Sequence, residues 1–289
     1  MKRSRRAPAE SSARGVEPDL ALDPGLTVSI LTGFIRTELL RTRRPKVVLG
    51  LSGGIDSAVA AYLATRALGP ASVVALVLPY RSSSPGSVRD AESVIGALGI
   101  LAEKFDISLL VDGFDRACGK VDRLRLGNVM ARARMMVLYD RSEQHRALVL
   151  GTSNKTELLL GYGTLWGDLA SALNPLGDLY KTQVRAIAEY LRVPAAIRRK
   201  PPSADLWPRQ SDEADLGFSY ERVDRLLALL VDARLDREAA VAAGFERELV
   251  DRVARLVVRS QFKRRPPIIA KVSTRTVGWD FRYPRDWKS

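Results

Sequence analysis

Residues 46–57 read Lys-Val-Val-Leu-Gly-Leu-Ser-Gly-Gly-Ile-Asp-Ser, and this stretch decides the fold. The apolar run over residues 47–51 is typical of a buried strand, and the Ala-rich segment over residues 58–68 is typical of a helix. Paired glycines between them let a ligand approach the backbone, and the free N–H groups of a helix N-terminus attract anions. The stretch therefore predicts a phosphate-binding turn between a strand and a helix.

This turn has two other interpretations. A Walker A loop is excluded, because no Gly-Lys-Ser or Gly-Lys-Thr ends the turn. A tight turn without a ligand is the plain structural alternative. The strand before the glycines and the helix after them favour phosphate binding over that alternative.

Strands and helices alternate along the first two thirds of the chain. Apolar runs predict four strands, at residues 46–51, 72–78, 105–108 and 147–150. Because helical segments separate them, we expect an α/β fold: a Rossmann-like, doubly wound parallel sheet flanked by helices, with a helical C-terminal part after residue 181. Each strand ends in polar or Gly-rich residues, so the carboxyl ends of the strands predict one shared site. The predicted helices cover residues 26–41, 57–68, 84–98, 124–140, 182–191, 220–232, 237–243 and 246–262.

Composition limits the possible classes of protein. The chain has 289 residues, 46% of them hydrophobic, which suits a sizeable core. Residues 1–24 are predicted to be a disordered basic tail, and residues 25–289 a single domain. The lone Cys118 excludes a disulfide framework and a Cys-based zinc site within one chain. The lone His145 is interpreted as a solvated residue at a helix end, which disfavours a Ser-His-Asp hydrolase.

The net charge of +13 has several possible meanings. A basic surface suits nucleic acid, but it equally suits a small polyanionic substrate such as ATP or a dinucleotide. A solvated, Arg-rich surface explains most of the charge without any ligand. No apolar run reaches the ~18 residues that a membrane span needs, so we expect no membrane partner and a cytoplasmic location.

Five further segments carry polar residues beyond the predicted turn. Two of them read Gly-Thr-Ser-Asn-Lys-Thr-Glu at residues 151–157 and Asn-Pro-Leu-Gly-Asp-Leu-Tyr-Lys-Thr at residues 174–182. In full, the segments are residues 78–83, 151–162, 166–184, 200–206 and 263–265. Together with the Ser-Gly-Gly turn they resemble the ammonia-dependent NAD synthetase family, within the ATP pyrophosphatase group, over residues 26–287.

The resemblance implies a carbon–nitrogen ligase. In that family ATP adenylates the nicotinate carboxylate of nicotinic acid adenine dinucleotide (deamido-NAD) and releases pyrophosphate. Ammonia then displaces AMP and gives NAD, in the last step of NAD biosynthesis. The resemblance implies ATP as co-substrate, Mg²⁺ and a homodimer, with the helices at residues 26–41 and 124–140 as candidates for its interface. No amide-hydrolysing domain is recognised, so we expect free ammonia or a separate partner that supplies it, and no nucleic acid.

The resemblance also assigns the ATP and metal sites. Asp56 and Glu157 are expected to bind Mg²⁺, since hard oxygen ligands suit that ion. Their plain alternatives are a helix cap and a solvated first-turn acid. Lys181 stands at a helix start, where a cation is disfavoured, and this placement favours a functional role. Asp56, Lys181 and Asp168 are the predicted catalytic residues. The residues expected to bind ATP are Gly50, Leu51, Ser52, Gly53, Gly54, Ile55, Asp56, Ser57, Arg81, Thr152, Lys181 and Ser203.

The acceptor site is where the chain departs from the family pattern. The family commonly has Lys-Tyr where this chain has Leu165-Trp166, an Asp where Ala172 stands, and a His where Phe262 stands. We expect a more apolar nicotinate pocket, with Trp166 stacked on the ring. For Asn128, Arg132 and Arg134, which lie in a predicted helix, the alternative is that they form one exposed helical face without a ligand. The residues expected to bind deamido-NAD are Asn128, Arg132, Arg134, Leu165, Trp166, Ala172, Phe262 and Lys263.

Two alternative functions remain open at this point. One is another ligase of the ATP pyrophosphatase type, such as a tRNA-modifying enzyme; such enzymes often carry cysteine pairs or an added RNA-binding domain, which are not seen here. The other is a basic nucleic-acid-binding protein on a degenerate nucleotide fold. The presence of Asp56, Glu157 and Lys181 favours a working active site.

Overall fold

The computed structural model describes residues 20–207 and 210–280. Its sheet has four parallel strands in the order β3-β2-β1-β4. Strand β1 has its successor β2 on one side and β4 on the other, so the order reverses at β1, which is where such sheets bind ligands. The strands are β1 (Lys46–Gly50), β2 (Val73–Val77), β3 (Leu101–Lys104) and β4 (Ala147–Val149).

Helices cover both faces of the sheet, as predicted. Alternate residues of β1 point to opposite faces: Val47 and Leu49 join one core and Val48 joins the other. The first core includes residues of α1 (Pro24–Leu40), α2 (Ile55–Leu68), α3 (Pro85–Leu98), α7 (Lys181–Tyr190) and α8 (Ala195–Arg199). The second includes residues of α4 (Ser108–Ala117) and α5 (Arg123–Gln144). The doubly wound α/β fold is confirmed.

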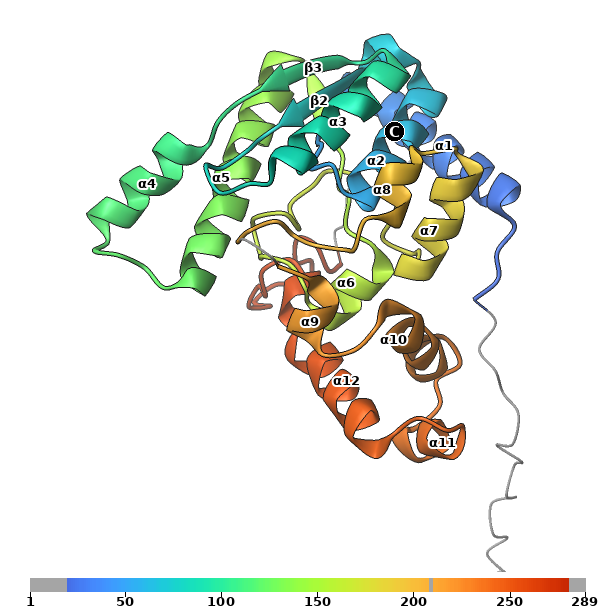
Figure 1. Cartoon of the computed structure of the whole chain (residues 1–289). Coiled ribbons are helices and arrows are strands. Elements are labelled where there is room, and N and C mark those ends of the chain that lie inside the picture. Colours follow the sequence, from blue (N-terminus) through green and yellow to red (C-terminus); the bar gives the residue numbers. More distant parts are fainter. Residues whose placement is uncertain (1–19, 208–209, 281–289) are drawn as a thin grey trace, which may run out of the picture.

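The C-terminal part is helical and has a core of its own. Short helix α6 (Lys155–Leu160) contributes to it, and Figure 1 shows the C-terminal helices gathered beside α6, away from the sheet. Helix α10 runs directly into a π-helical turn, Ala228–Asp232. The elements are α9 (Asp212–Leu216), α10 (Tyr220–Leu227), the π turn, α11 (Arg237–Ala242), α12 (Arg247–Arg259) and a 3₁₀ turn (Gln261–Arg264).

Two local predictions are wrong. The third strand is Leu101–Lys104, not residues 105–108, and Ser108 opens α4. This edge strand is mostly exposed, so it lacks the apolar run by which a buried strand is recognised. His145 does end helix α5, but its side chain is only 15% exposed, and its Nε2 lies 2.5 Å from Oε1 of Glu103. The imidazole therefore packs against the edge strand instead of facing solvent.

The predicted tail, residues 1–24, overlaps the described residues at its end. Residues 1–19 lie outside the described residues. Residues 20–24 are described: the Leu20 carbonyl accepts a hydrogen bond from Gln183, and Asp23 caps α1 at the amide of Leu26. Whether residues 25–289 form a single domain stays a prediction. Within residues 20–207 and 210–280, no helix is both long and apolar enough to cross a bilayer.

Candidate active site

The glycine turn between β1 and α2 is closed by hydroxyl groups. The Ser57 hydroxyl donates to the Gly54 carbonyl at 3.0 Å and accepts from the Ser52 amide at 3.2 Å, so it ties both ends of the turn together. Gly53 has φ +76°, and a Cβ there would lie 2.1 Å from the Ser87 carbonyl oxygen. Only glycine fits this contact between the turn and α3.

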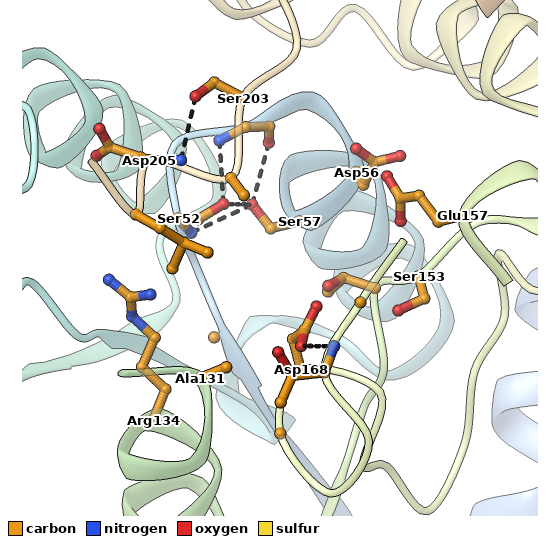
Figure 2. A pocket seen from close by; sticks show the side chains of 18 of the residues that line it. Ser52, Asp56, Ser57, Ala131, Arg134, Ser153, Glu157, Asp168, Ser203 and Asp205 are labelled. Carbon is orange, nitrogen blue, oxygen red and sulfur yellow. Dashed lines mark hydrogen bonds between the residues drawn. The ribbon is translucent and has the colours of Figure 1, made fainter. Parts of the chain in front are cut away.

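Two carboxylates and one lysine meet beside this turn. The Lys181 ammonium donates to Asp56 at 2.5 Å and to Glu157 at 3.4 Å, and the Lys181 side chain is only 3% exposed. Asp56 stands in the first turn of α2, Glu157 in the first turn of α6, and Lys181 opens α7. Figure 2 shows Asp56 and Glu157 side by side at the pocket. Three residues far apart in sequence thus form one charged cluster.

Asn154, which the sequence analysis missed, orients this cluster. Its side-chain amide donates to Asp56 at 2.9 Å, while its oxygen accepts from the Glu157 amide at 3.0 Å. The Glu157 carboxylate in turn accepts a hydrogen bond from the backbone amide of Asn154, which completes a capping box. The Asn-x-x-Glu spacing at residues 154–157 was the available signal for this cap.

The electrostatics of the cluster are dominated by burial. Burial and the neighbouring Asp56 raise the pKa of Glu157 to about 8, against the opposing influence of Lys181. For Lys181, burial alone would lower the pKa, but Asp56 and Glu157 outweigh it and raise that pKa above its ordinary value. Lys181 is therefore held as a cation, despite the helix N-terminus on which it stands.

A second buried carboxylate behind the cluster was also missed. Asp212 accepts hydrogen bonds from the hydroxyls of Tyr162 at 3.0 Å and Tyr220 at 3.3 Å, and from the Ala204 amide at 3.1 Å. The Lys181 ammonium also lies 5.1 Å from the centre of the Tyr220 ring. No sequence pattern joins these residues, because they come from three separate segments.

The charged cluster, Asp212 and most of the glycine turn face one cavity of about 1040 Å³ at the carboxyl edge of the sheet. Most of the residues expected to bind ATP line it, together with Glu157 and Asp168. Gly53 faces α3 instead, and Arg81 is exposed and pairs with Asp112 outside the lining. The lining residues on the ATP side are Gly50, Leu51, Ser52, Gly54, Ile55, Asp56, Ser57, Thr152, Lys181 and Ser203.

The segment over residues 200–207 forms another wall of the cavity. The Lys200 ammonium donates to Asp90 at 2.8 Å, and Asp205 accepts from the Ser84 amide at 3.0 Å, so both attach the segment to α3. Ser203 lines the cavity, and its hydroxyl accepts from the Asp205 amide. The guanidinium carbon of Arg123 lies 4.5 Å from the centre of the Trp207 ring, and this contact attaches the segment to α5.

The acceptor residues divide into two groups. Asn128, Arg134 and Lys263 line the cavity, as expected for substrate contacts. The Arg134 guanidinium donates to the Leu78 carbonyl at 3.1 Å, and in the view of Figure 2 it lies across the pocket from the Asp56–Glu157 pair. Lys263 donates to the carbonyls of Gly161 and Gly163, at 2.8 and 2.7 Å, and so holds the loop before Asp168.

Asp168 lines the same cavity as these two cations. Its carboxylate accepts from the Thr164 amide at 2.7 Å. Burial among the cavity walls raises the pKa of Asp168, although the Thr164 hydrogen bond, Arg134 and Lys263 oppose the shift. Asn128 accepts from the Thr164 hydroxyl at 2.8 Å, so the same loop is also held from α5.

The other acceptor residues do not line this cavity. Arg132 donates to the Leu165 carbonyl at 3.3 Å, and Ala172 and Phe262 are exposed. Trp166 has φ +58°, is 52% exposed, and lines a separate hollow of about 250 Å³ with Met135 and Tyr139. The stacking of Trp166 on a nicotinate ring stays a prediction.

Comparisons with known proteins agree with this geometry. Residues 27–267 match the family model described as NAD synthase. A protein from Chlorobium phaeobacteroides (strain DSM 266), named NH(3)-dependent NAD(+) synthetase, is 55% identical over 270 residues, which cover 93% of this chain and 98% of that protein.

Two solved structures of synthetases resemble this chain over most of its length. An NH3-dependent NAD synthetase from Campylobacter jejuni is 34% identical with a TM-score of 0.74, and the match covers 86% of this chain and 100% of that one. An NMN synthetase from Francisella tularensis is 31% identical with a TM-score of 0.78, covering 86% of this chain and 99% of that one. On these grounds the chain belongs to the NAD synthase family.

Proposed function

We propose that this chain amidates the nicotinate carboxylate of deamido-NAD with ammonia, at the expense of ATP, and so completes the biosynthesis of NAD. The observation that carries the proposal is the meeting of the glycine turn with the Asp56, Glu157 and Lys181 cluster in one cavity. The curated relatives named NH(3)-dependent NAD(+) synthetase support the choice of reaction.

The reaction needs two steps because hydroxide is a poor leaving group. An oxygen of the nicotinate carboxylate attacks the α-phosphorus of ATP, and the bond to pyrophosphate breaks. Ammonia then adds to the carbonyl carbon, AMP leaves, and the nitrogen loses a proton. The residues of the chain have to bind the triphosphate, stabilise the departing pyrophosphate and take up that proton.

The triphosphate belongs on the turn between β1 and α2. The turn leads into the N-terminus of α2, where unpaired amides favour an anion, and the Ser52 and Ser57 hydroxyls lie in the same turn. Lys181 supplies a fixed positive charge at the same wall, with its position set by two carboxylates. Arg81 is assigned to the nucleotide by family resemblance alone.

Asp56 and Glu157 fit a magnesium ion. Mg²⁺ is commonly held by one or two carboxylates together with substrate phosphates. Two carboxylates, tied to one another through Asn154, face the cavity beside the phosphate turn. When bound there, the ion would supply charge neutralisation for the phosphates.

We assign the acceptor to the opposite wall. Arg134 and Lys263 bring positive charge to a dinucleotide, and Asn128 and Arg132 hold the loop that carries Asp168. Asp168 is the candidate proton acceptor, since a carboxyl with a raised pKa suits proton transfer. Leu165, Ala172 and Phe262 are also assigned to the acceptor site, by the family resemblance alone.

Exposed apolar side chains support a homodimer. Helix α1 buries Val28 and Ile35 in the core but exposes Leu26 and Ile30. Helix α5 likewise exposes Met136 and Tyr139, and Tyr139 lines one hollow together with Trp166. We place the enzyme in the cytoplasm, with ammonia either free or supplied by a separate partner. Light scattering that gives a monomer mass at micromolar concentration would rule the dimer out.

The test is pyrophosphate release from ATP with each substrate omitted in turn. We expect release only when deamido-NAD and Mg²⁺ are present, and NAD only when ammonium is added. Glutamine in place of ammonium is expected to give no NAD from the purified chain. RNA-dependent release without deamido-NAD would instead support a tRNA-modifying ligase.

The likeness to an NMN synthetase motivates one more arm of this assay. Nicotinic acid mononucleotide replaces deamido-NAD at equal concentration. We expect a kcat/KM at least tenfold higher for the dinucleotide, because the 55% identical relative is named for NAD. A preference for the mononucleotide would reassign the acceptor but leave the ATP chemistry intact.

A further inference from the structure

Asp224 is a buried carboxylate that does not line the cavity. It stands on α10, is fully buried, and accepts three hydrogen bonds. They come from the Thr156 hydroxyl at 2.6 Å, the Thr182 amide at 2.8 Å and the Thr182 hydroxyl at 2.9 Å. Burying a carboxylate costs free energy unless hydrogen bonds compensate for the lost water. The groups that donate to Asp224 are therefore the groups whose positions it stabilises.

The same network reaches the backbone of Lys181. The Thr156 hydroxyl donates to Asp224 and accepts from the Lys181 amide at 3.0 Å. The first two amides of α7, at residues 181 and 182, are therefore both bonded through this carboxylate. An anion at a helix N-terminus is stabilising, and here it offsets the unfavourable lysine at the first helical position.

The partners of Asp224 are the sequence neighbours of the charged cluster. Thr156 immediately precedes Glu157, and Thr182 immediately follows Lys181. Residues 156–157 of α6 and 181–182 of α7 are thus both attached to one carboxylate, which lies outside the cavity lining. We name this set of contacts, from Asp224 to Thr156, Thr182 and the Lys181 amide, the Asp224 bridge.

A second acidic residue ties the same two helix starts. Asp232 accepts from the Lys155 ammonium and the Tyr180 hydroxyl, both at 2.9 Å. In a regular α-helix, eight residues turn ~80° past two full turns, which would direct Asp224 and Asp232 to different faces. Asp232 lies in the π-helical turn, whose wider winding takes up part of that excess.

We propose that Asp224 is a positioning residue for the reaction, which sets the separation of the Lys181 ammonium from the Glu157 carboxylate through Thr156 and Thr182. This inference rests on the proposed function. Asp224 touches no substrate; it acts through the first turns of α6 and α7. Burial raises the pKa of Asp224, and the hydrogen bonds from Thr156 and Thr182 oppose that shift.

The decisive variants are Thr156→Val and Thr156→Ser. Valine keeps the shape but removes the hydroxyl that joins Asp224 to the Lys181 amide, whereas serine keeps the hydroxyl. We expect kcat for pyrophosphate release to fall about tenfold in the valine variant, since small misplacements of a reacting group cost that much or more. We expect the serine variant to stay within twofold of wild type, and the KM for deamido-NAD to stay within twofold in both.

Thr32→Val is the matched control. Thr32 is another buried threonine, on α1, and its hydroxyl donates to the Val28 carbonyl of the same helix at 2.8 Å. We expect a smaller loss of melting temperature, because no buried carboxylate loses a partner, and no loss of kcat. Equal loss of kcat in both valine variants, or wild-type kcat in Thr156→Val, would overturn the positioning role.

Amide hydrogen exchange tests the bridge without any substrate. We expect Asp224→Asn and Thr156→Val to speed exchange at the amides of residues 181 and 182, and Thr32→Val to leave it unchanged. Unchanged exchange in both bridge variants would overturn the inference. If wild-type protein turns over no deamido-NAD, the proposed function fails, but this exchange result still reports on the bridge.

Discussion

The wall of the cavity that carries Asp56, Glu157 and Lys181 is held by hydrogen bonds within one chain, whereas Trp166 and Phe262, assigned to the acceptor, are exposed to solvent. Lys181 is only 3% exposed, while Trp166 and Phe262 are 52% and 60% exposed. A buried charge has to be paired and fixed by neighbouring groups, which is why Asn154 and Asp224 stand behind the cluster. Exposed aromatic side chains need no such support until a ligand or a second copy covers them.

Removing Lys181 is expected to give the largest effect. Lys181→Met leaves Asp56 and Glu157 facing one another without a cation. We expect the free energy of unfolding in urea to fall by about 3 kcal/mol, the typical cost of breaking a buried ion pair. Pyrophosphate release should fall by at least about 100-fold, because a fixed charge on the phosphates is lost.

Lys271→Met is the control for this loss. Lys271 pairs with Asp280 at an exposed site, where an ion pair contributes about 0–1 kcal/mol. A Lys181 variant as stable and as active as the Lys271 variant would show that the buried cluster contributes neither to stability nor to catalysis.

Gly53→Ala is expected to have an intermediate effect. The new Cβ would meet the Ser87 carbonyl at 2.1 Å on a backbone with φ +76°. We expect a loss of about 1–3 kcal/mol, as is usual for strained backbone positions, and a raised KM for ATP, because the turn has to move.

The matched control is Gly69→Ala, where φ is +80° but no atom lies within 4 Å of the added Cβ. It should cost stability without changing the KM for ATP. If both variants behave alike, the contact of the turn with α3 has no part in nucleotide binding.

Trp166→Ala is expected to have the smallest effect on stability, because the side chain is half exposed. If Trp166 stacks on the nicotinate ring, the KM for deamido-NAD should rise about twofold to twelvefold, because an aromatic contact contributes about 0.5–1.5 kcal/mol. The KM for ATP should stay unchanged. Steady-state kinetics with each substrate varied decide this, and an unchanged KM for deamido-NAD would remove Trp166 from the acceptor site.

Much of the fold was predictable because its signals are local. The runs at residues 46–51 and 72–78 are buried on both faces of the sheet, so they read as apolar strands. Strand β3 was missed because it is an edge strand with exposed side chains, held by backbone pairing to β2. Backbone pairing leaves little trace in side-chain pattern.

The site was predictable where a motif binds through its own backbone, and less so where distant segments meet. The turn at residues 51–57 follows from two glycines and a helix start. Asp212 and Asp224, in contrast, gain their roles from partners on other segments of the chain, Tyr162 and Thr156 among them. Such pairs have no fixed spacing, so a single sequence does not reveal them.

The sequence by itself determined the phosphate turn, the alternation of strands and helices, and the family resemblance, because each depends on residues close together in the chain. Only the tertiary structure decided that Asp56, Glu157 and Lys181 share one buried cluster, and that Asp224 holds two of their helices. Folding brings these groups out of water together, and in that setting charge pairing and hydrogen bonding become strong enough to fix their positions.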